Sequence, residues 1–407
     1  MRDSTPRFVP VDESRRIVSL DVLRGFALLG ILAVNAVPFS MPEAAAFNPA
    51  AYGDMEGANR LIWIAVHAFG ELKFQTLFTV LFGAGIVLMT GRCEEQGLSA
   101  TGLHYRRMMW LIVFGLMHGN LVWYGDILYW YGMCGLVVFL FRKLQPRWLL
   151  FWGILFTVIP SALMLLSGLA AESEGVRSAI ADLDPSPEVI VSEVAAYRGS
   201  WLEQMTHRVP SAVALETFVF LFWALWRVSG VMLVGMALYK MGVLSAKRSR
   251  SFYVALVAVA LLVGMPIIGI GIQHNFTNQW VSTARAYLIG VQHNYWASLL
   301  VGLGWIGTVM LLCQSAVLGW LKRALAAVGR MAFSNYILQT LICTSIFYGH
   351  GLGLFGKVER TGLALIVLAI WILQLTISPI WLRHFRFGPL EWVWRSLSYM
   401  KLQPFRR

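Results

Sequence analysis

The chain consists mainly of apolar blocks, each about as long as a helix that crosses a lipid bilayer. A bilayer core about 30 Å thick requires about 20 apolar residues in a helix, and apolar runs of nearly this length recur throughout the sequence. Charged residues make up only 13% of the chain, whereas about a quarter is typical of soluble domains. The sequence therefore predicts an all-α, polytopic transmembrane helix bundle.

About ten segments have the length and hydropathy of spans, and nine or eleven would fit equally well. We expect spans near residues 17–41, 74–90, 108–123, 127–141, 148–168, 215–239, 252–272, 297–318, 332–347 and 363–382. A separate interfacial helix is an alternative for residues 61–72. We expect residues 1–407 to form one transmembrane domain, with an acidic extracytoplasmic loop at about 171–210 and an amphipathic C-terminal segment at about 386–400.

The loop charges predict the orientation. Most of the 33 Lys and Arg residues fall in alternate loops, starting with the N-terminus, and the acidic residues collect in the other loops. Because basic residues are retained on the cytoplasmic side, we expect both termini in the cytoplasm. A bacterial cytoplasmic membrane is the predicted location, with membrane lipid as the surroundings. The same bias accounts for the net charge of +12 without a nucleic-acid partner.

The sequence offers little support for a metal or a bound cofactor. The eight histidines show no metal-ligand spacing, and three of the four cysteines lie inside apolar blocks. Residues 351–357 spell most of a phosphate-binding loop, but Val358 stands where the motif needs a Ser or Thr to bind magnesium. We expect no metal site and no bound cofactor.

Two ionisable residues lie near the start of the first predicted span. Asp21 and Arg24 are three residues apart, so they share one helix face and can pair. A charge in the membrane core costs roughly 2.5–3.5 kcal/mol and therefore needs a partner or a purpose. The pair either anchors the helix at the cytoplasmic interface or binds a substrate or lipid headgroup.

The third and fourth spans form a hairpin that carries a histidine and an aspartate. His118 falls in the outer third of the membrane, and Asp126 opens the returning helix. A carboxylate that holds a histidine fixes its tautomer and makes it a general base. Alternatively, His118 bonds a backbone carbonyl and Asp126 caps the helix. Gly115 and Gly119 would let another backbone come close.

Other polar residues give weaker signals. Glu71 and Lys73 are expected at a wetted outer mouth, with His67 at the interface beside them. Arg227 lies mid-span and must be buried, with Asp21 and Glu216 as possible partners. Asn335 places an amide inside a span, which is typical of interhelical hydrogen bonds. The tryptophans of the C-terminal amphipathic segment are expected to face lipid.

Several of these stretches resemble one family. The sequence resembles the YeiB family of bacterial inner-membrane proteins, whose function is unknown. The matching stretches span almost the whole chain: residues 19–31 (SLDVLRGFALLGI), 73–85 (KFQTLFTVLFGAG), 118–119 (HG), 125–128 (GDIL), 329–343 (GRMAFSNYILQTLIC) and 388–395 (GPLEWVWR).

This family in turn resembles the transmembrane acyltransferase superfamily, which includes the acyltransferase-3 proteins and heparan-α-glucosaminide N-acetyltransferase. The likeness depends mainly on Leu20-Asp-Val-Leu-Arg-Gly25. It implies transfer of an acyl group from a cytoplasmic donor such as acyl-CoA to an envelope glycan or similar acceptor. The acyltransferase-3 proteins carry a catalytic histidine at the position of Asn35, so the base here must come from elsewhere, and His118 is the best-placed candidate.

Two functional hypotheses follow. In an acyltransferase, Asp21 and Arg24 would hold the donor, and His118, oriented by Asp126, would deprotonate the acceptor. Lys73 and Asn35 would line the path between them, and Asn335 is a further candidate for substrate binding. In a small-molecule transporter, the glycine-rich spans and the buried Arg227 would instead form the route by which the molecule crosses the membrane. A non-catalytic scaffold fits the buried charges less well. The sequence predicts neither the substrate nor the oligomeric state.

Overall fold

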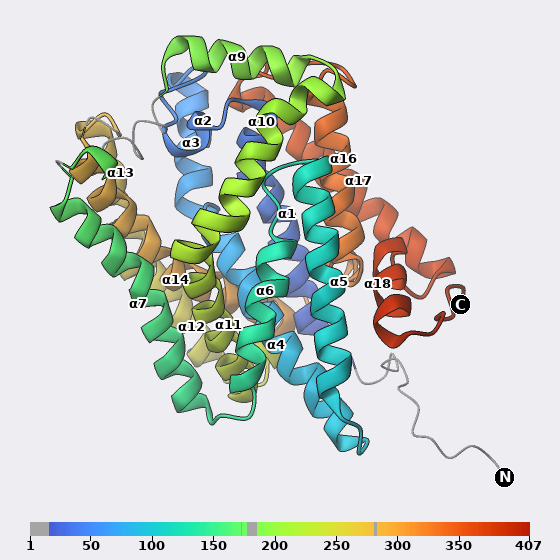
Figure 1. Cartoon of the computed structure of the whole chain (residues 1–407). Helices are drawn as coiled ribbons and strands as arrows, with labels where there is room; N and C mark the ends of the chain where they lie inside the picture. The colour runs from blue at the N-terminus through green and yellow to red at the C-terminus, as the bar shows by residue number, and fades with distance from the viewer. Residues whose placement is uncertain (1–15, 172, 177–184, 281–282) are drawn as a thin grey trace.

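The computed structural model describes residues 16–171, 173–176, 185–280 and 283–407, which form a bundle of helices (Figure 1). No β-strand occurs in these ranges, and a single isolated bridge pairs Phe385 with Arg406. The prediction of an all-α helix bundle is confirmed.

The helices follow one another with short connections. Their bounds are α1 (Val18–Ser40), α2 (Ala44–Phe47), α3 (Gly57–Phe69), α4 (Lys73–Glu95), α5 (Ala100–Leu121), α6 (Leu128–Val138), α7 (Pro146–Leu169), α9 (Pro187–Arg198), α10 (Trp201–Ala214), α11 (Leu225–Lys240), α12 (Arg250–Val259), α13 (Met265–Thr277), α14 (Ala284–Gln314), α15 (Gly319–Arg330), α16 (Ala332–Phe347), α17 (Arg360–His384) and α18 (Pro389–Tyr399). Short π-helical stretches, η3 (Leu215–Ala224) and η5 (Ala260–Gly264), join α10 to α11 and α12 to α13.

The chain is a membrane protein. Within the described residues, seven helices or runs of adjoining helices are long and apolar enough to cross a bilayer. They are Val18–Ser40, Gly57–Glu95, Pro146–Leu169, Trp201–Lys240, Arg250–Thr277, Ala284–Gln314 and Arg360–His384. Two shorter apolar helices, Leu128–Phe141 and Ala332–Phe347, and the 22-residue α5 occupy the other expected spans. The number of crossings and the orientation stay predictions.

The segment expected as an acidic loop contains helices where the structure describes it. Pro187 occupies the first turn of α9, where its missing N–H costs nothing. Ser200 then starts α10 with a capping box, because its side chain accepts from the Glu203 N–H and Glu203 binds back to the Ser200 N–H. The helical run Trp201–Lys240 therefore begins well before the predicted span at 215–239.

The two ends of the bundle differ in charge. α9 lies across one end, near α2 and α3, and the α4–α5 and α6–α7 connections lie at the other end (Figure 1). We call the first the acidic end, since it carries Glu43, Asp54, Glu188, Glu193 and Glu203. We call the second the basic end, since its loops and helix ends carry Arg92, Lys143, Arg147, Lys247 and Lys322.

Helix α1 runs through the centre and packs against α4, α14, α15, α16 and α17. Two glycines bring its backbone against that of α15. A Cβ on Gly25 would collide with the carbonyl of Leu325, and one on Gly329 with the carbonyl of Asp21. This close approach fixes the helix face that carries Asp21 against α15, at the basic end.

Candidate functional site

The α5–α6 hairpin brings His118 and Asp126 into direct contact. The Nδ1 atom of His118 lies 2.8 Å from Oδ1 of Asp126, and both residues are buried. The other carboxylate oxygen accepts a hydrogen bond of 2.7 Å from the Tyr129 N–H in the first turn of α6. Asp126 therefore serves both roles that the sequence suggested. One carboxylate oxygen orients His118, and the other binds a backbone N–H in the first turn of α6.

The second ring nitrogen of His118 contacts a hydroxyl group from a distant helix. Its Nε2 lies 3.0 Å from Oγ1 of Thr340, a fully buried residue of α16. Asp126, His118 and Thr340 thus form a chain of two hydrogen bonds. Sequence reasoning missed Thr340, although it belongs to the stretch 329–343 that carries the family resemblance. A threonine inside an apolar helix gives no signal of its own.

Aromatic rings enclose this chain of hydrogen bonds, which we call the Thr-His-Asp cluster. The Tyr336 ring lies 5.4 Å from the His118 ring, and the Trp123 ring lies 6.2 Å from it. Trp123 in turn stacks on Phe39 at 4.0 Å. The cluster therefore lies in a low-dielectric environment, where its electrostatic interactions are strong.

A cavity of about 610 Å³, which we call the inner cavity, opens at the basic end and reaches Tyr336. Arginines from the start of α1, from α4, from α5 and from the C-terminal segment line it, and so does Arg330. They are Arg16, Arg24, Arg92, Arg107, Arg330, Arg386 and Arg395. Its inner part is lined by apolar and aromatic side chains, among them Phe82, Leu111, Leu128 and Tyr131. Basic groups at the mouth and an apolar interior suit an anionic amphiphile.

Asp21 and Arg24 both line the inner cavity, as a substrate-binding role requires. Arg24 donates a hydrogen bond of 3.1 Å to Asp21, whose other oxygen lies 3.9 Å from Arg16. The Arg24 side chain keeps 30% of its surface exposed. The predicted pair has formed, and its arginine remains accessible to a ligand in the cavity.

The C-terminal helix α18 forms one wall of this cavity. Glu391 accepts from the Phe333 N–H at 2.6 Å and from the Ser334 hydroxyl, which attaches α18 to the start of α16. Trp394 lines the cavity and donates to the Arg107 carbonyl at 3.0 Å. The expectation that the tryptophans of this segment face lipid is wrong for Trp394, because this hydrogen bond and the Arg107 guanidinium over its ring hold it against α5.

The inner cavity also contains a residue that sequence reasoning overlooked. His104 of α5 lines the cavity and places Nε2 3.0 Å from the Gly135 carbonyl. Its Nδ1 is buried and has no hydrogen-bond partner among the described residues. This histidine lies nearer the basic end than His118, on the same helix.

Lys73 belongs to a different cluster. It is fully buried rather than wetted, because its ammonium group donates to the His67 carbonyl and to the Asn294 side chain. Glu71 accepts from Asn294 at 3.2 Å and lies 2.6 Å from Nδ1 of His67. Lys73 does not line the inner cavity.

Arg227 lies near this cluster and finds partners other than those proposed. Its guanidinium donates to the Tyr295 carbonyl at 3.2 Å and to the Ser298 hydroxyl at 2.7 Å, and it lies over the Tyr295 ring. Neither Asp21 nor Glu216 pairs with it among the ion pairs of the described residues. Its contacts join α11 to α14.

The remaining predicted residues lie away from the inner cavity. Asn335 donates to the Val328 carbonyl and to Ser378, while its own carbonyl accepts from Gln374. These are the interhelical hydrogen bonds that the sequence predicts. Asn35 lies half-buried in the half of α1 nearer the acidic end. The structure thus brings Asp21 and Arg24 to one cavity and places His118 and Asp126 behind its innermost wall.

Comparisons with known proteins agree with the resemblance to the YeiB family. A family model described as a protein of unknown function (DUF418) matches residues 238–401. The chain is 34% identical over 399 residues to the uncharacterized protein YeiB of Escherichia coli K12, covering 96% of this chain and 98% of that protein. It is also 34% identical over 415 residues to the uncharacterized protein YxaH of Bacillus subtilis 168, covering 98% of each.

Proposed function

The chain belongs to the YeiB family, whose function is unknown, and we propose that it is an acyltransferase of the bacterial cytoplasmic membrane. The reaction would move an acyl group from a cytoplasmic thioester donor of the acyl-CoA class to a hydroxyl of an envelope glycan or similar acceptor. The observation that carries this proposal is the Asp126–His118–Thr340 chain of hydrogen bonds, placed directly behind the inner cavity.

The inner cavity suits the proposed donor. Guanidinium groups bind phosphate oxygens through paired hydrogen bonds, and the arginines at the mouth would hold the phosphates of a coenzyme A thioester. The apolar interior would receive the acyl chain, with the donor carbonyl close to Tyr336. The positive-inside rule assigns the basic end to the cytoplasm, where such donors occur.

The Thr-His-Asp cluster supplies the parts of a nucleophilic mechanism. With the Nδ1 proton directed at Asp126, His118 Nε2 can accept the proton of the Thr340 hydroxyl. Thr340 Oγ1 would bond to the acyl carbon as the carbon–sulfur bond breaks. The proton would pass through His118 to the departing thiolate, leaving an acyl ester on Thr340.

A second half-reaction would complete the transfer. The acceptor hydroxyl would bond to the acyl carbon and the ester bond to Thr340 would break. His118 would take the acceptor proton and return it to Thr340 Oγ1. The ring of Tyr336 must move aside in the first step, because it separates the cavity from His118. The Trp123 ring, 6.2 Å from the His118 ring, would also have to make room for the acceptor.

The test is covalent labelling of the purified full-length chain with radiolabelled acetyl-CoA. We expect label that survives denaturation on the wild type and is absent from Thr340→Val. His118→Ala should slow labelling by about 10²–10⁴-fold, the range that a general base contributes. Asn335→Ala, which removes interhelical hydrogen bonds without touching the cluster, is the matched control and should keep the label. Equal labelling of wild type, Thr340→Val and His118→Ala would overturn the mechanism.

Transport of an anionic amphiphile is the second candidate function. The π-helical stretches η3 and η5 interrupt two of the long helical runs, and such interruptions are frequent at functional sites. Proteoliposomes loaded with radiolabelled coenzyme A separate the two candidates. Release of coenzyme A without covalent labelling of the chain would favour transport over acyl transfer.

A further inference from the structure

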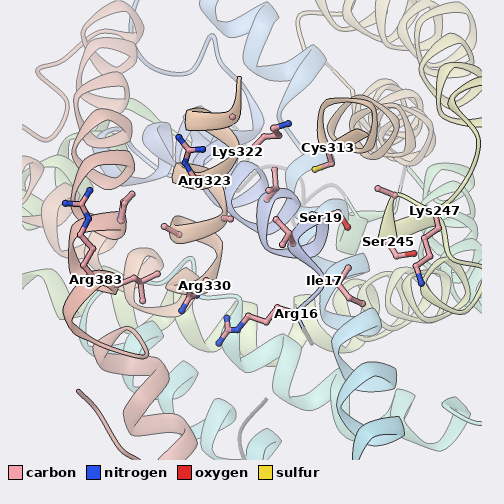
Figure 2. Close-up of a pocket in the computed structure, with 18 of the residues that line it drawn as sticks. Arg16, Ile17, Ser19, Ser245, Lys247, Cys313, Lys322, Arg323, Arg330 and Arg383 are labelled. Atoms are coloured by element: carbon pink, nitrogen blue, oxygen red, sulfur yellow. The ribbon is translucent and has the colours of Figure 1, made fainter. Parts of the chain in front are cut away.

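A second hollow at the basic end has about 910 Å³ of space and gathers cations from segments far apart in the sequence (Figure 2). We call it the basic pocket. The cations that line it are Arg16, Lys247, Lys322, Arg323, Arg330, Arg383 and Arg407. They come from the residues before α1, from the α11–α12 connection, from α15, from the end of α17 and from Arg407. Asp and Glu are absent from its lining among the described residues.

Arg16 lies 3.9 Å from the Asp21 carboxylate, but four other cations of this pocket form no ion pair within the described parts of the chain. Lys322 donates to the Ser315 carbonyl at 2.6 Å, which leaves its positive charge in place. Lys247, Arg323 and Arg383 are exposed, and none of them forms an ion pair with a described residue. Figure 2 shows the labelled cations on different sides of the space, with Ile17, Ser19 and Cys313 between them.

The general excess of basic residues at this end does not explain the pocket. Arg142 and Lys143 lie at the same end, and both are within 4 Å of the Glu94 carboxylate, at 3.7 and 3.8 Å. Arg147 lies against the Trp148 ring. The positive-inside rule requires basic loops, but it does not require that their cations surround a concave space lined by no Asp or Glu side chain of the described residues. Like charges gathered in this way repel one another unless an anion lies between them.

We propose that the basic pocket binds the phosphate-bearing headgroup of an anionic phospholipid, and that a headgroup with two phosphates, such as that of cardiolipin, fits it best. Basic pockets between helices on the cytoplasmic side of a membrane suit such headgroups. The volume exceeds the size of one phosphate group, and cations on several sides can bind two phosphates at once.

The surroundings favour a lipid over a soluble polyphosphate. Apolar residues Ile17, Val22 and Leu382 line the pocket beside the cations. Two exposed apolar side chains would face acyl chains: Val18, which lines the pocket and is 62% exposed, and Trp320, which follows the lining residue Gly319 and is 61% exposed. A headgroup in the pocket would therefore extend into the same leaflet without leaving the membrane.

The basic pocket is separate from the inner cavity but shares a wall with it. Arg16 and Arg330 line both. A phosphate in the basic pocket would bind these two guanidinium groups. It would thereby reduce the positive charge that can attract a ligand to the inner cavity. The lipid site does not depend on the proposed acyl transfer, because its test measures binding alone.

The test is cardiolipin binding to the purified full-length chain, measured by native mass spectrometry and in nanodiscs of phosphatidylcholine with increasing cardiolipin. The variant Lys322→Gln, Arg323→Gln, Arg383→Gln removes three cations. Since each basic residue near an anionic headgroup contributes about fivefold, we expect binding to weaken by about 100-fold. The matched control, Lys143→Gln with Arg147→Gln, removes two cations outside the pocket at the same end and should bind as the wild type does.

Two further measurements separate loss of charge from misfolding and a lipid from a soluble polyphosphate. The charge-conserving variant Lys322→Arg, Arg323→Lys, Arg383→Lys should retain binding within a few-fold, which separates loss of charge from misfolding. Sodium pyrophosphate supplies two phosphates without acyl chains and should bind at least tenfold more weakly. Pyrophosphate binding as tight as that of cardiolipin would overturn the lipid assignment. Unchanged cardiolipin binding in the triple Gln variant would overturn the site.

Discussion

Arginines serve different purposes at the two ends of the bundle. At the acidic end, Arg360 and Arg208 are almost completely buried, and their guanidinium groups bind backbone carbonyls. Arg360 donates to the carbonyls of Pro49, Tyr52 and Asp54, and Arg208 to that of Val122. At the basic end, Arg24 and Arg383 line cavities and keep part of their surface exposed.

The difference follows from the kind of backbone at each end. The 41–56 segment contains little regular structure, so its carbonyls need donors from elsewhere, and buried arginines supply them. At the basic end some arginines also bind carbonyls, as Arg106 binds that of Ser398 at 2.9 Å, but Arg24 and Arg383 keep part of their surface exposed. Arg360 and Arg208 at the acidic end therefore stabilise the fold, whereas Arg24 and Arg383 at the basic end are placed to bind a ligand.

The largest expected effect that tests this contrast is Arg360→Ala. Three hydrogen bonds from a charged donor disappear and three carbonyls lose a partner, at about 1.5 kcal/mol for each bond. We expect a loss of stability of about 4.5 kcal/mol, seen as a lower unfolding temperature of the detergent-solubilised protein. Arg386→Ala, an exposed arginine of the basic end, is the control and should leave that temperature unchanged. An equal drop in both variants would break the comparison.

A second prediction concerns carboxylates at the acidic end. Burial raises the pKa of Glu193 to about 7, and burial also raises the pKa of Glu43. The Glu43 N–H donates to Glu193 at 3.0 Å, and Ser211 donates to the Glu43 carboxylate at 2.8 Å. The pair joins α9 and α10 to the segment after α1, and it is most stable when a proton is bound.

The sign of the pH dependence follows from these pKa values. The folded chain holds the Glu193 proton more strongly than the unfolded chain, whose carboxyl pKa is 4.5. The stability that the bound proton gives below pH 4.5 is therefore lost as the pH rises to about 7, by about 3 kcal/mol. Glu193→Gln should be less sensitive to pH between 5 and 8 in thermal unfolding. Glu188→Gln, an exposed carboxylate on the same helix, should keep the wild-type dependence.

How far the sequence predicts such features depends on the distance along the chain. The His118–Asp126 contact was predictable because eight residues of one hairpin separate its members. The Thr340 contact was not, since 222 residues separate it from His118 and nothing in an apolar helix specifies which helix it faces. The helix bundle follows from hydropathy alone. The inner cavity depends on how α1, α5, α16 and α18 pack, and the glycine contact of α1 with α15 becomes visible only in the structure.

The smallest expected effect lies at the inner cavity. Arg24→Gln removes one of several cations at its mouth and should weaken coenzyme A binding by about fivefold, the contribution of about 1 kcal/mol typical of one exposed charge. The Asp21 carboxylate keeps Arg16 at 3.9 Å, so the unfolding temperature should not change. Isothermal titration of the solubilised protein with coenzyme A measures the affinity, and Arg147→Gln is the control. If Arg24→Gln lowered the unfolding temperature and left the affinity for coenzyme A unchanged, Arg24 would stabilise the fold as Arg360 does. The proposed difference in arginine function between the two ends would then be wrong.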